Sequence, residues 1–224
     1  MSGLIEVTGP AVEPISRIEA REHLRLDDDV DDSQVRAYIT AARVWAENYT
    51  GRVFINRTMR QSLDGYTSHS GGYWEGTVTA PSITTVSNHI ELAASPVASV
   101  TSIKYFDDAD NESTWDSSNY YVDTVGDVAK IVLRDGGSLP TDLRAANGLE
   151  ITFVAGYGTS PTNVPEPIRV AILQYMTFLY EHRGDFERSP PPTPPAILKT
   201  LLQPYKIMRF GSHPYNKMLK SGIG

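Results

Sequence analysis

Residues 164–184 constrain the fold more than any other stretch of the chain, because their pattern predicts one long apolar helix. Pro165 and Pro167 suit its first turn, where a missing N–H costs little, and Gly184 is expected to end it. At about 1.5 Å per residue the helix spans roughly 30 Å, the width of a small domain. Its apolar side chains recur at the spacing of a single helical face: Ile168, Ala171, Ile172, Tyr175, Met176 and Leu179.

Three further apolar side chains, Val170, Leu173 and Phe178, lie off this face. A helix that is apolar on more than one side needs more than one partner. Two interpretations are open: the second side is buried within the same chain, or it contacts another copy of the protein.

The N-terminal part predicts an extended arm over residues 1–14 and then two helices. Ser16 and Glu19 have the spacing of a capping box, which predicts a helix over residues 17–25. A second helix is predicted over residues 33–50, with Gly51 as its stop. Tyr38, Trp45 and Tyr49 share its apolar side and are interpreted as core or subunit contact, with a ligand platform as the alternative.

No catalytic, cofactor-binding or metal site is predicted, so the chain is not expected to be an enzyme. The aspartates at 27–32 do not complete a calcium loop, because Asp32 and Tyr38 stand where glycine and glutamate are needed. The 5 histidines are scattered, there is no cysteine, and neither a phosphate-binding loop nor a nucleophile elbow is present. The most apolar window, residues 170–180, is too short to span a membrane, and the first residues lack a signal peptide, so a soluble, unsecreted chain is expected.

Between residues 53 and 163 the helical period gives way to short β-branched runs separated by turn residues. The expected fold class is therefore α+β: a helical domain of residues 15–52 and 164–204 with a β-rich domain, residues 53–163, inserted between its halves. After the proline-rich segment 189–195, a short helix is expected to end near Gln203. Strands are predicted at residues 58–63, 76–80, 88–92, 99–106, 120–122, 129–133 and 149–154.

The last segment, residues 205–224, is basic and contains no acidic residue, although the whole chain has a net charge of −7. It is rich in glycine and serine and is expected to be a disordered arm that orders on a partner. A DNA-facing role and a solvated tail without a partner are the alternatives. The residues expected to dock are aromatic anchors and cations: Tyr205, Lys206, Arg209, Phe210, Tyr215, Lys217 and Lys220.

Several blocks, taken together and in order, resemble the head–tail connector (adaptor) proteins of long-tailed double-stranded DNA bacteriophages and gene transfer agents. They extend over roughly residues 10–205. The blocks are VEPIS at 12–16, AREHLRLD at 20–27, AARVWAENYTGR at 41–52, PVASVTSI at 96–103, FVAGYG at 153–158 and LYEHR at 179–183.

This resemblance implies a structural virion protein that forms a ring, with twelve copies, beneath the portal protein in the neck between capsid and tail. It implies assembly in the host cytoplasm, a tail-side connector, stopper or tail-terminator protein as a second partner, and genome DNA passing through the channel without sequence-specific contacts. No membrane is involved. The alternative from another class is a β-sandwich module that binds carbohydrate or another ligand, with Trp74, Trp115 and the tyrosines around Tyr120 as aromatic platforms.

Overall fold

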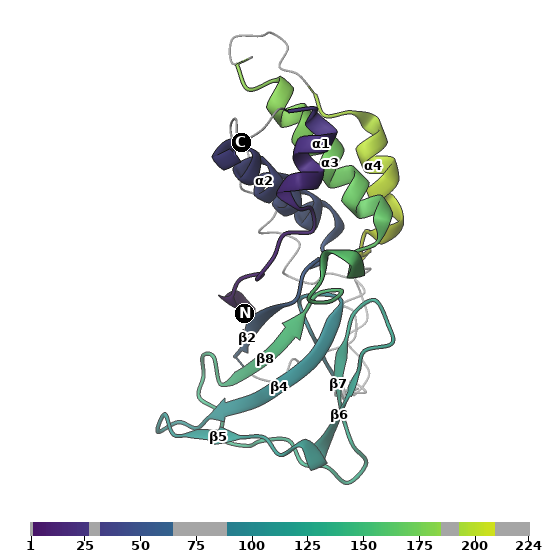
Figure 1. The fold of residues 1–224 in the computed structure, drawn as a ribbon. Helices are drawn as coiled ribbons and strands as arrows, with labels where there is room; N and C mark the ends of the chain where they lie inside the picture. The colour runs from purple at the N-terminus through teal and green to yellow at the C-terminus, as the bar shows by residue number, and fades with distance from the viewer. Residues whose placement is uncertain (1, 27–31, 65–88, 185–192, 209–224) are drawn as a thin grey trace, which may run out of the picture.

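The computed structural model describes residues 2–26, 32–64, 89–184 and 193–208. Helices gather at one end of the molecule and strands at the other, as Figure 1 shows. Helices together with antiparallel sheets agree with the α+β prediction. The strand expected at residues 76–80 and the aspartates at 27–31 lie outside the described residues.

The helical end contains α1 (Arg17–Leu24), α2 (Asp32–Thr50), α3 (Glu166–Glu181) and α4 (Ala196–Leu202). The capping box of α1 is confirmed, because the Glu19 N–H donates to Ser16 Oγ at 3.2 Å and the Ser16 N–H donates to Glu19 Oε2 at 2.8 Å. Gly51 ends α2 as predicted, with a φ of 72° and its N–H on the Glu47 carbonyl at 2.8 Å.

Gly184 does not end α3, contrary to the prediction. The helix ends at Glu181, and the N–H of His182 donates to the Phe178 carbonyl at 3.2 Å. His182 Nδ1 also lies 2.9 Å from that carbonyl, so the cap residue itself closes the last turn.

The helices enclose one apolar core. The long helix α3 packs against α1, α2 and α4. Buried residues from all four helices and from the segments that enter and leave them form this core: Ile15, Ala20, Val35, Ile39, Ala42, Ala46, Phe54, Ile55, Val164, Ile168, Ala171, Ile172, Met176, Leu198 and Leu202.

The strands form two antiparallel sheets. The larger has the order β1-β2-β8-β4-β5 and the smaller the order β3-β7-β6. The two sheets contribute to one shared core, to which β8 gives alternate residues from Leu149 to Ala155. The strands are β1 (Ser2–Thr8), β2 (Arg57–Leu63), β3 (His89–Glu91), β4 (Val97–Phe106), β5 (Glu112–Thr114), β6 (Tyr120–Asp123), β7 (Lys130–Leu133) and β8 (Leu149–Ala155).

The first residues are extended but are not a separate arm. They form β1, which pairs with β2 from Ser2 opposite Leu63 to Glu6 opposite Met59. The sequence did not reveal this pairing, because the partner strand lies more than 50 residues further along the chain.

The two connections between helices and sheets run side by side. The Tyr157 N–H donates to the Phe54 carbonyl at 3.0 Å, and the Asn56 N–H donates to the Gly158 carbonyl at 2.9 Å. Gly156 has a φ of 143°, and a Cβ there would lie 2.4 Å from the backbone nitrogen of Asn56. A side chain at position 156 would therefore push the two connections apart.

Candidate functional site

The described residues contain no group of three or more histidine, aspartate or glutamate side chains arranged to hold a metal ion. In the same part of the chain, no helix is both long and apolar enough to cross a bilayer. The features that stand out are surfaces, and the most extended of them lies on α2 and α3.

A ladder of aromatic rings runs from the end of α2 across to the end of α3. Trp45 stacks on Tyr49 and on Tyr175, with ring centroids 5.8 Å and 4.3 Å apart. Tyr175 stacks on Phe178 at 6.0 Å, and Phe178 lies 4.5 Å from the ring of His182. All five side chains are only half-buried, so the ladder covers the core and also faces solvent. Such rings contribute most to binding when a partner covers them completely.

The other predicted contact residues lie elsewhere on α2 and α3. The ring of Tyr38 meets that of Tyr180 edge-on at 6.2 Å, and the Arg183 guanidinium lies 4.2 Å from the centre of the Tyr180 ring. Val170 and Leu173 are half-buried, and Leu173 packs against the helical core. The second apolar side of α3 is therefore covered in part by its own chain.

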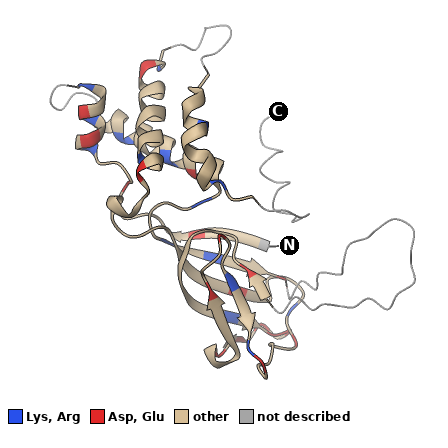
Figure 2. Ribbon diagram, turned by 90° about the vertical axis from the view of Figure 1, so that its right-hand side faces the viewer, with Lys and Arg blue, Asp and Glu red and all other residues tan. Residues whose placement is uncertain are grey.

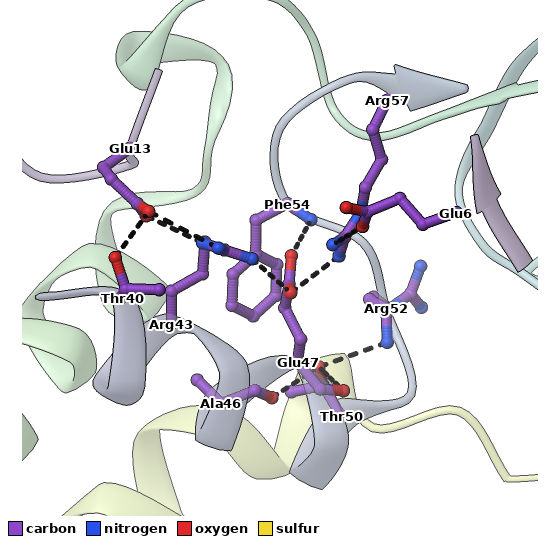
Figure 3. A network of polar contacts seen from close by, with 10 residues as sticks. All are labelled: Glu6, Glu13, Thr40, Arg43, Ala46, Glu47, Thr50, Arg52, Phe54 and Arg57. Carbon is purple, nitrogen blue, oxygen red and sulfur yellow. Dashed lines mark hydrogen bonds and ion pairs between the residues drawn. The ribbon is translucent and has the colours of Figure 1, made fainter. Parts of the chain in front are cut away.

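A buried ionic network joins α2 to the sheets and to the N-terminal segment, as Figure 3 shows. The Glu47 carboxylate lies 2.9 Å from Arg43 Nη1 and 2.6 Å from Arg57 Nη2, and it accepts the Phe54 N–H at 3.0 Å. The desolvation of Arg43 is outweighed by Glu13 and Glu47, so that the pKa of this guanidinium is raised above its ordinary value.

The same two arginines hold the N-terminal segment in place. Arg43 Nε donates to Glu13 at 2.7 Å, and Arg57 Nη1 donates to Glu6 at 2.6 Å. Because Arg57 belongs to β2 and Glu47 to α2, the network fixes the sheets against the helices. Sequence reasoning missed Glu47, although Arg43 precedes it by four residues, the spacing of an ion pair along one helix.

The residues that follow α4 lie across the end of α2. The Ile207 N–H donates to the Thr50 carbonyl at 2.8 Å, which satisfies one of the carbonyls left unpaired at a helix end. Arg52 Nε donates to the Tyr205 carbonyl at 2.6 Å, and Lys206 Nζ lies 5.0 Å from the centre of the Tyr49 ring.

Tyr205 and Lys206, expected to be free for a partner, are thus held by their own chain as far as Ile207. The C-terminal end of α2 attracts residues 205–207 because it offers an unpaired carbonyl and the negative end of the helix dipole. The other docking residues predicted from the sequence lie outside the described residues: Arg209, Phe210, Tyr215, Lys217 and Lys220.

A groove of about 720 Å³ opens beside the start of α1. Residues 10–17 form one side of it, α2 forms the other, and Pro161 lies at its border. Its lining is mixed: Ile15 and Ile39 belong to the helical core, and Glu13, Arg17 and Arg36 add charged groups.

Two of the aromatic residues expected as platforms in the β region, Trp115 and Tyr120, are buried, whereas the neighbouring Tyr121 is 46% exposed. Trp115 is 5% exposed, and its Nε1–H donates to the Ser138 carbonyl at 3.0 Å. Tyr120 packs 4.8 Å from it, and burial raises the pKa of the Tyr120 hydroxyl. Both rings belong to the core between the sheets, while Trp74 lies outside the described residues.

Comparison with known proteins gives one family of sequences and one shared fold. Residues 18–114 match the sequence model of the phage gp6-like head-tail connector protein family. This match includes α1, α2 and strands β2 to β5, and it confirms the resemblance to head–tail connector proteins. None of the curated protein sequences compared with the chain matches it.

Solved structures share the fold over nearly the whole chain. One is from the neck of an empty gene transfer agent particle computed with C6 symmetry, with a TM-score of 0.72, 24% identity, and coverage of 94% of this chain and 98% of that chain. Another is from the neck of a native particle computed with C12 symmetry, with a TM-score of 0.69, 22% identity and the same coverage. A chain from the virion of a native gene transfer agent particle gives a TM-score of 0.71 at 22% identity, again with 94% and 98% coverage. At these identities the likeness establishes the fold.

Proposed function

We propose that this chain is a structural subunit of the neck of a phage-like particle, where twelve copies form a ring between head and tail. The observation that carries the proposal is the fold, shared over 94% of the chain with a neck computed with C12 symmetry. The family match over residues 18–114 supports the same class of protein.

The surfaces of the helical end fit this role. A ring built from identical subunits needs two different complementary surfaces on each copy. The aromatic ladder, with Trp45, Tyr175 and Phe178 at its centre, is half-buried in the single chain, so a neighbour that covers it gains apolar contact. Residues 15–52 and 164–204 would form the ring, and residues 53–163 would project from it.

Residues 209–224 would dock on the portal protein above the ring. Their cations suit an acidic surface, and Phe210 and Tyr215 supply anchors. The held residues Tyr205 to Ile207 would fix the point from which this segment leaves the helices. Genome DNA would pass through the channel, and the tail-side connector, stopper or tail-terminator protein would bind the opposite end of the ring.

The role places the protein in the virion neck after assembly in the host cytoplasm, without catalysis. Electron cryomicroscopy of particles that contain the protein tests the role directly, with the number of copies checked by quantitative mass spectrometry. We expect a ring of twelve copies at the head–tail vertex, whereas one or two copies in each particle would contradict the proposal.

Deleting residues 209–224 tests the docking segment separately. The shortened chain keeps every described contact, so its thermal unfolding should match that of the full chain, whereas its attachment to portal-containing heads should be lost. Attachment that is unchanged, measured with DNase-treated heads so that DNA cannot act as the bridge, would contradict the docking role.

A further inference from the structure

Residues 203–207, the C-terminal strap, lie against the place where the helices meet the sheets. The Tyr205 side chain packs against the helical core, and the Tyr49 hydroxyl donates to Gln203 Oε1 at 3.0 Å. At the far end of the strap, the Ile207 N–H donates to the Thr50 carbonyl at 2.8 Å. Two residues of α2 therefore hold the strap.

Arg52 connects this strap to the β region. It lies between α2 and β2, on one of the segments that join the helical end to the sheets, and Figure 2 shows basic residues on these segments. Its Nε donates to the Tyr205 carbonyl at 2.6 Å, and its Nη2 lies 2.6 Å from Asp127 Oδ1. Asp127 belongs to the loop between β6 and β7. One guanidinium therefore binds the strap with one nitrogen and the β region with another.

The loop that carries Asp127 is itself held in place. The Asp127 carbonyl accepts a hydrogen bond from the Ser95 hydroxyl, and the Val53 N–H donates to the Ser95 carbonyl at 2.7 Å. Ser95 is 1% exposed, so these bonds form away from water. A movement of Arg52 should therefore break its pair with Asp127 rather than carry the loop along.

Arg52 also lies near the second connection between helices and sheets. Burial raises the pKa of the Tyr157 hydroxyl, and the positive charge of Arg52 opposes this rise. The Tyr157 N–H donates to the Phe54 carbonyl at 3.0 Å, which ties the second connection to the first. The strap, both connections and the β6–β7 loop thus meet around one cation.

The burial of Arg52 makes its two bonds depend on each other. The Arg52 side chain is 11% exposed, whereas the Asp127 side chain is 71% exposed. An ion pair with an exposed partner contributes little when water reaches both charges. The strap keeps water from Arg52 Nε and supplies the acceptor that a buried cation needs. If the strap leaves, water reaches the guanidinium and screens its attraction to Asp127.

We propose that the C-terminal strap is a latch: while it is seated, it strengthens the contact of Arg52 with Asp127 and fixes the β region against the helices. The coupling is reciprocal, because a change at Asp127 must alter the seating of the strap by the same factor. A partner that draws residues 209–224 away from α2 would unseat the strap and loosen the β region. This use of the latch rests on the proposed function.

Hydrogen exchange at the Ile207 N–H, followed by NMR in the isolated full-length protein, tests the coupling. This N–H is bonded to Thr50 while the strap is seated, so its exchange rate reports how often the strap opens. Asp127→Asn changes the β-region side of Arg52 and should speed this exchange roughly threefold, the effect of losing an exposed ion pair. Arg52→Gln loses the charged bonds to both sides and should speed it about tenfold.

Arg60→Gln is the matched control for these variants. It removes a cation from β2 that lies 3.5 Å from Glu150, so exchange at Ile207 should stay unchanged. Circular dichroism of all three variants should match that of the unchanged protein.

Spin labels measure the movement of the β region, because the chain has no cysteine of its own. Val44→Cys on α2 and Ser113→Cys on β5, both exposed, carry the labels, and electron–electron double resonance gives the distances between them. Ile207→Pro removes the N–H that holds the strap and should broaden the distance distribution. Lys206, the residue before it, already has the extended backbone that proline requires. Ile207→Val keeps the N–H and should leave the distribution unchanged.

Arg52→Gln combined with Ile207→Pro shows whether the two changes break the same latch. The combined variant should give a distribution no broader than that of either single variant, since coupled residues are not additive. Broadening that adds up from the two changes would overturn the latch.

The remaining outcomes separate the latch from the proposed function. Unchanged exchange at Ile207 in Asp127→Asn, or equal distance distributions for Ile207→Pro and Ile207→Val, overturns the latch and leaves the ring in place. Particles in which the unchanged protein forms no ring overturn the proposed function, whereas the latch is measured in the isolated protein and does not depend on them.

Discussion

The two tryptophans in the described part of this protein, one on a helix and one between the sheets, are covered to different extents. Between the sheets, Trp115 and Tyr120 are buried, and the indole N–H of Trp115 has its partner within the chain. On the helices, Trp45, Tyr175 and Phe178 stack in an open ladder that remains half-buried. Trp115 is therefore part of the closed core between the sheets, whereas the ladder on the helices keeps apolar surface that a neighbour can cover.

Polar groups show the same difference. Gln61 lies inside the sheet core, where its Nε2 donates to the Glu91 carbonyl at 3.1 Å and its Oε1 accepts the Ala93 N–H at 2.8 Å. Both halves of this buried amide are satisfied inside the β region. Glu47 instead connects regions, since its partners come from α2 and from β2. Gln61 therefore has its polar contacts within the β region, whereas Glu47 holds the two ends of the molecule together.

Phe153 gives the largest expected effect and tests whether the sheet core is self-sufficient. It is 0% exposed in the centre of β8, so Phe153→Ala should lower the free energy of unfolding by about 4 kcal/mol. Chemical denaturation followed by circular dichroism measures this loss. Val154→Ala, the next residue on the other side of the same strand and half-buried, should cost about 1 kcal/mol. Equal losses of unfolding free energy at Phe153 and Val154 would show that the core between the sheets contributes no more stability than the outer face of β8.

Glu47 tests the joint between the two regions. Glu47→Ala leaves Arg43 and Arg57 buried without the carboxylate that they share, and it should lower the free energy of unfolding by about 3 kcal/mol. The matched control is Glu150→Ala, which removes a more exposed partner 3.5 Å from Arg60 and should cost less than about 1 kcal/mol. A Glu47 variant as stable as the Glu150 variant would show that the network does not hold the joint.

The local part of this architecture could be predicted from the sequence. The capping box of Ser16 and Glu19 and the stop at Gly51 depend on residues within one helical turn, and both are confirmed. The described strands β2 to β4 and β6 to β8 fall close to their expected positions because alternation and turn residues are local signals. The ladder residues were assigned to the correct helices, but their half-exposed stacking depends on how α2 meets α3.

The missed features are non-local. In β1, Ile5 and Val7 alternate with Glu6 and Thr8, but they are 49% and 53% exposed and only the pairing with β2 defines the strand. The three residues of β5 are polar and all exposed, and only their pairing with β4 defines the strand. The anchoring of Tyr205 and Lys206 depends on the end of α2, more than 150 residues earlier in the chain.

Phe178 tests whether the aromatic ladder on the helices serves assembly more than the stability of the single chain. Because the ring is half-buried, Phe178→Ala should lower the free energy of unfolding by only about 1 kcal/mol, mainly through its lost stacking on Tyr175. Its effect on incorporation into portal-containing heads should be larger, since assembly would bury the ring completely. A variant that incorporates normally while losing stability would assign Phe178 to the core alone.

Glu19 gives the smallest expected effect and tests how the start of α1 is held against α3. Burial opposes its charge, but the N–H and hydroxyl of Ser16 together with Arg169 outweigh burial and hold the pKa of Glu19 below its ordinary value of 4.5. A lowered pKa in the folded state stabilises the protein at pH values above 4.5, and the stabilisation disappears as the pH falls through the folded-state value.

Glu19→Gln keeps the capping hydrogen bonds and removes only the charge. At pH 7 its cost should stay below about 1 kcal/mol, because the side chain is 39% exposed and solvent screens the ion pair. Denaturation of both proteins between pH 3 and pH 7 should show this difference shrinking below about pH 4.5. Glu22→Gln, on the same helix and exposed, is the control, and a difference for Glu19→Gln that persists unchanged at pH 3 would rule out the ion pair with Arg169 as its cause.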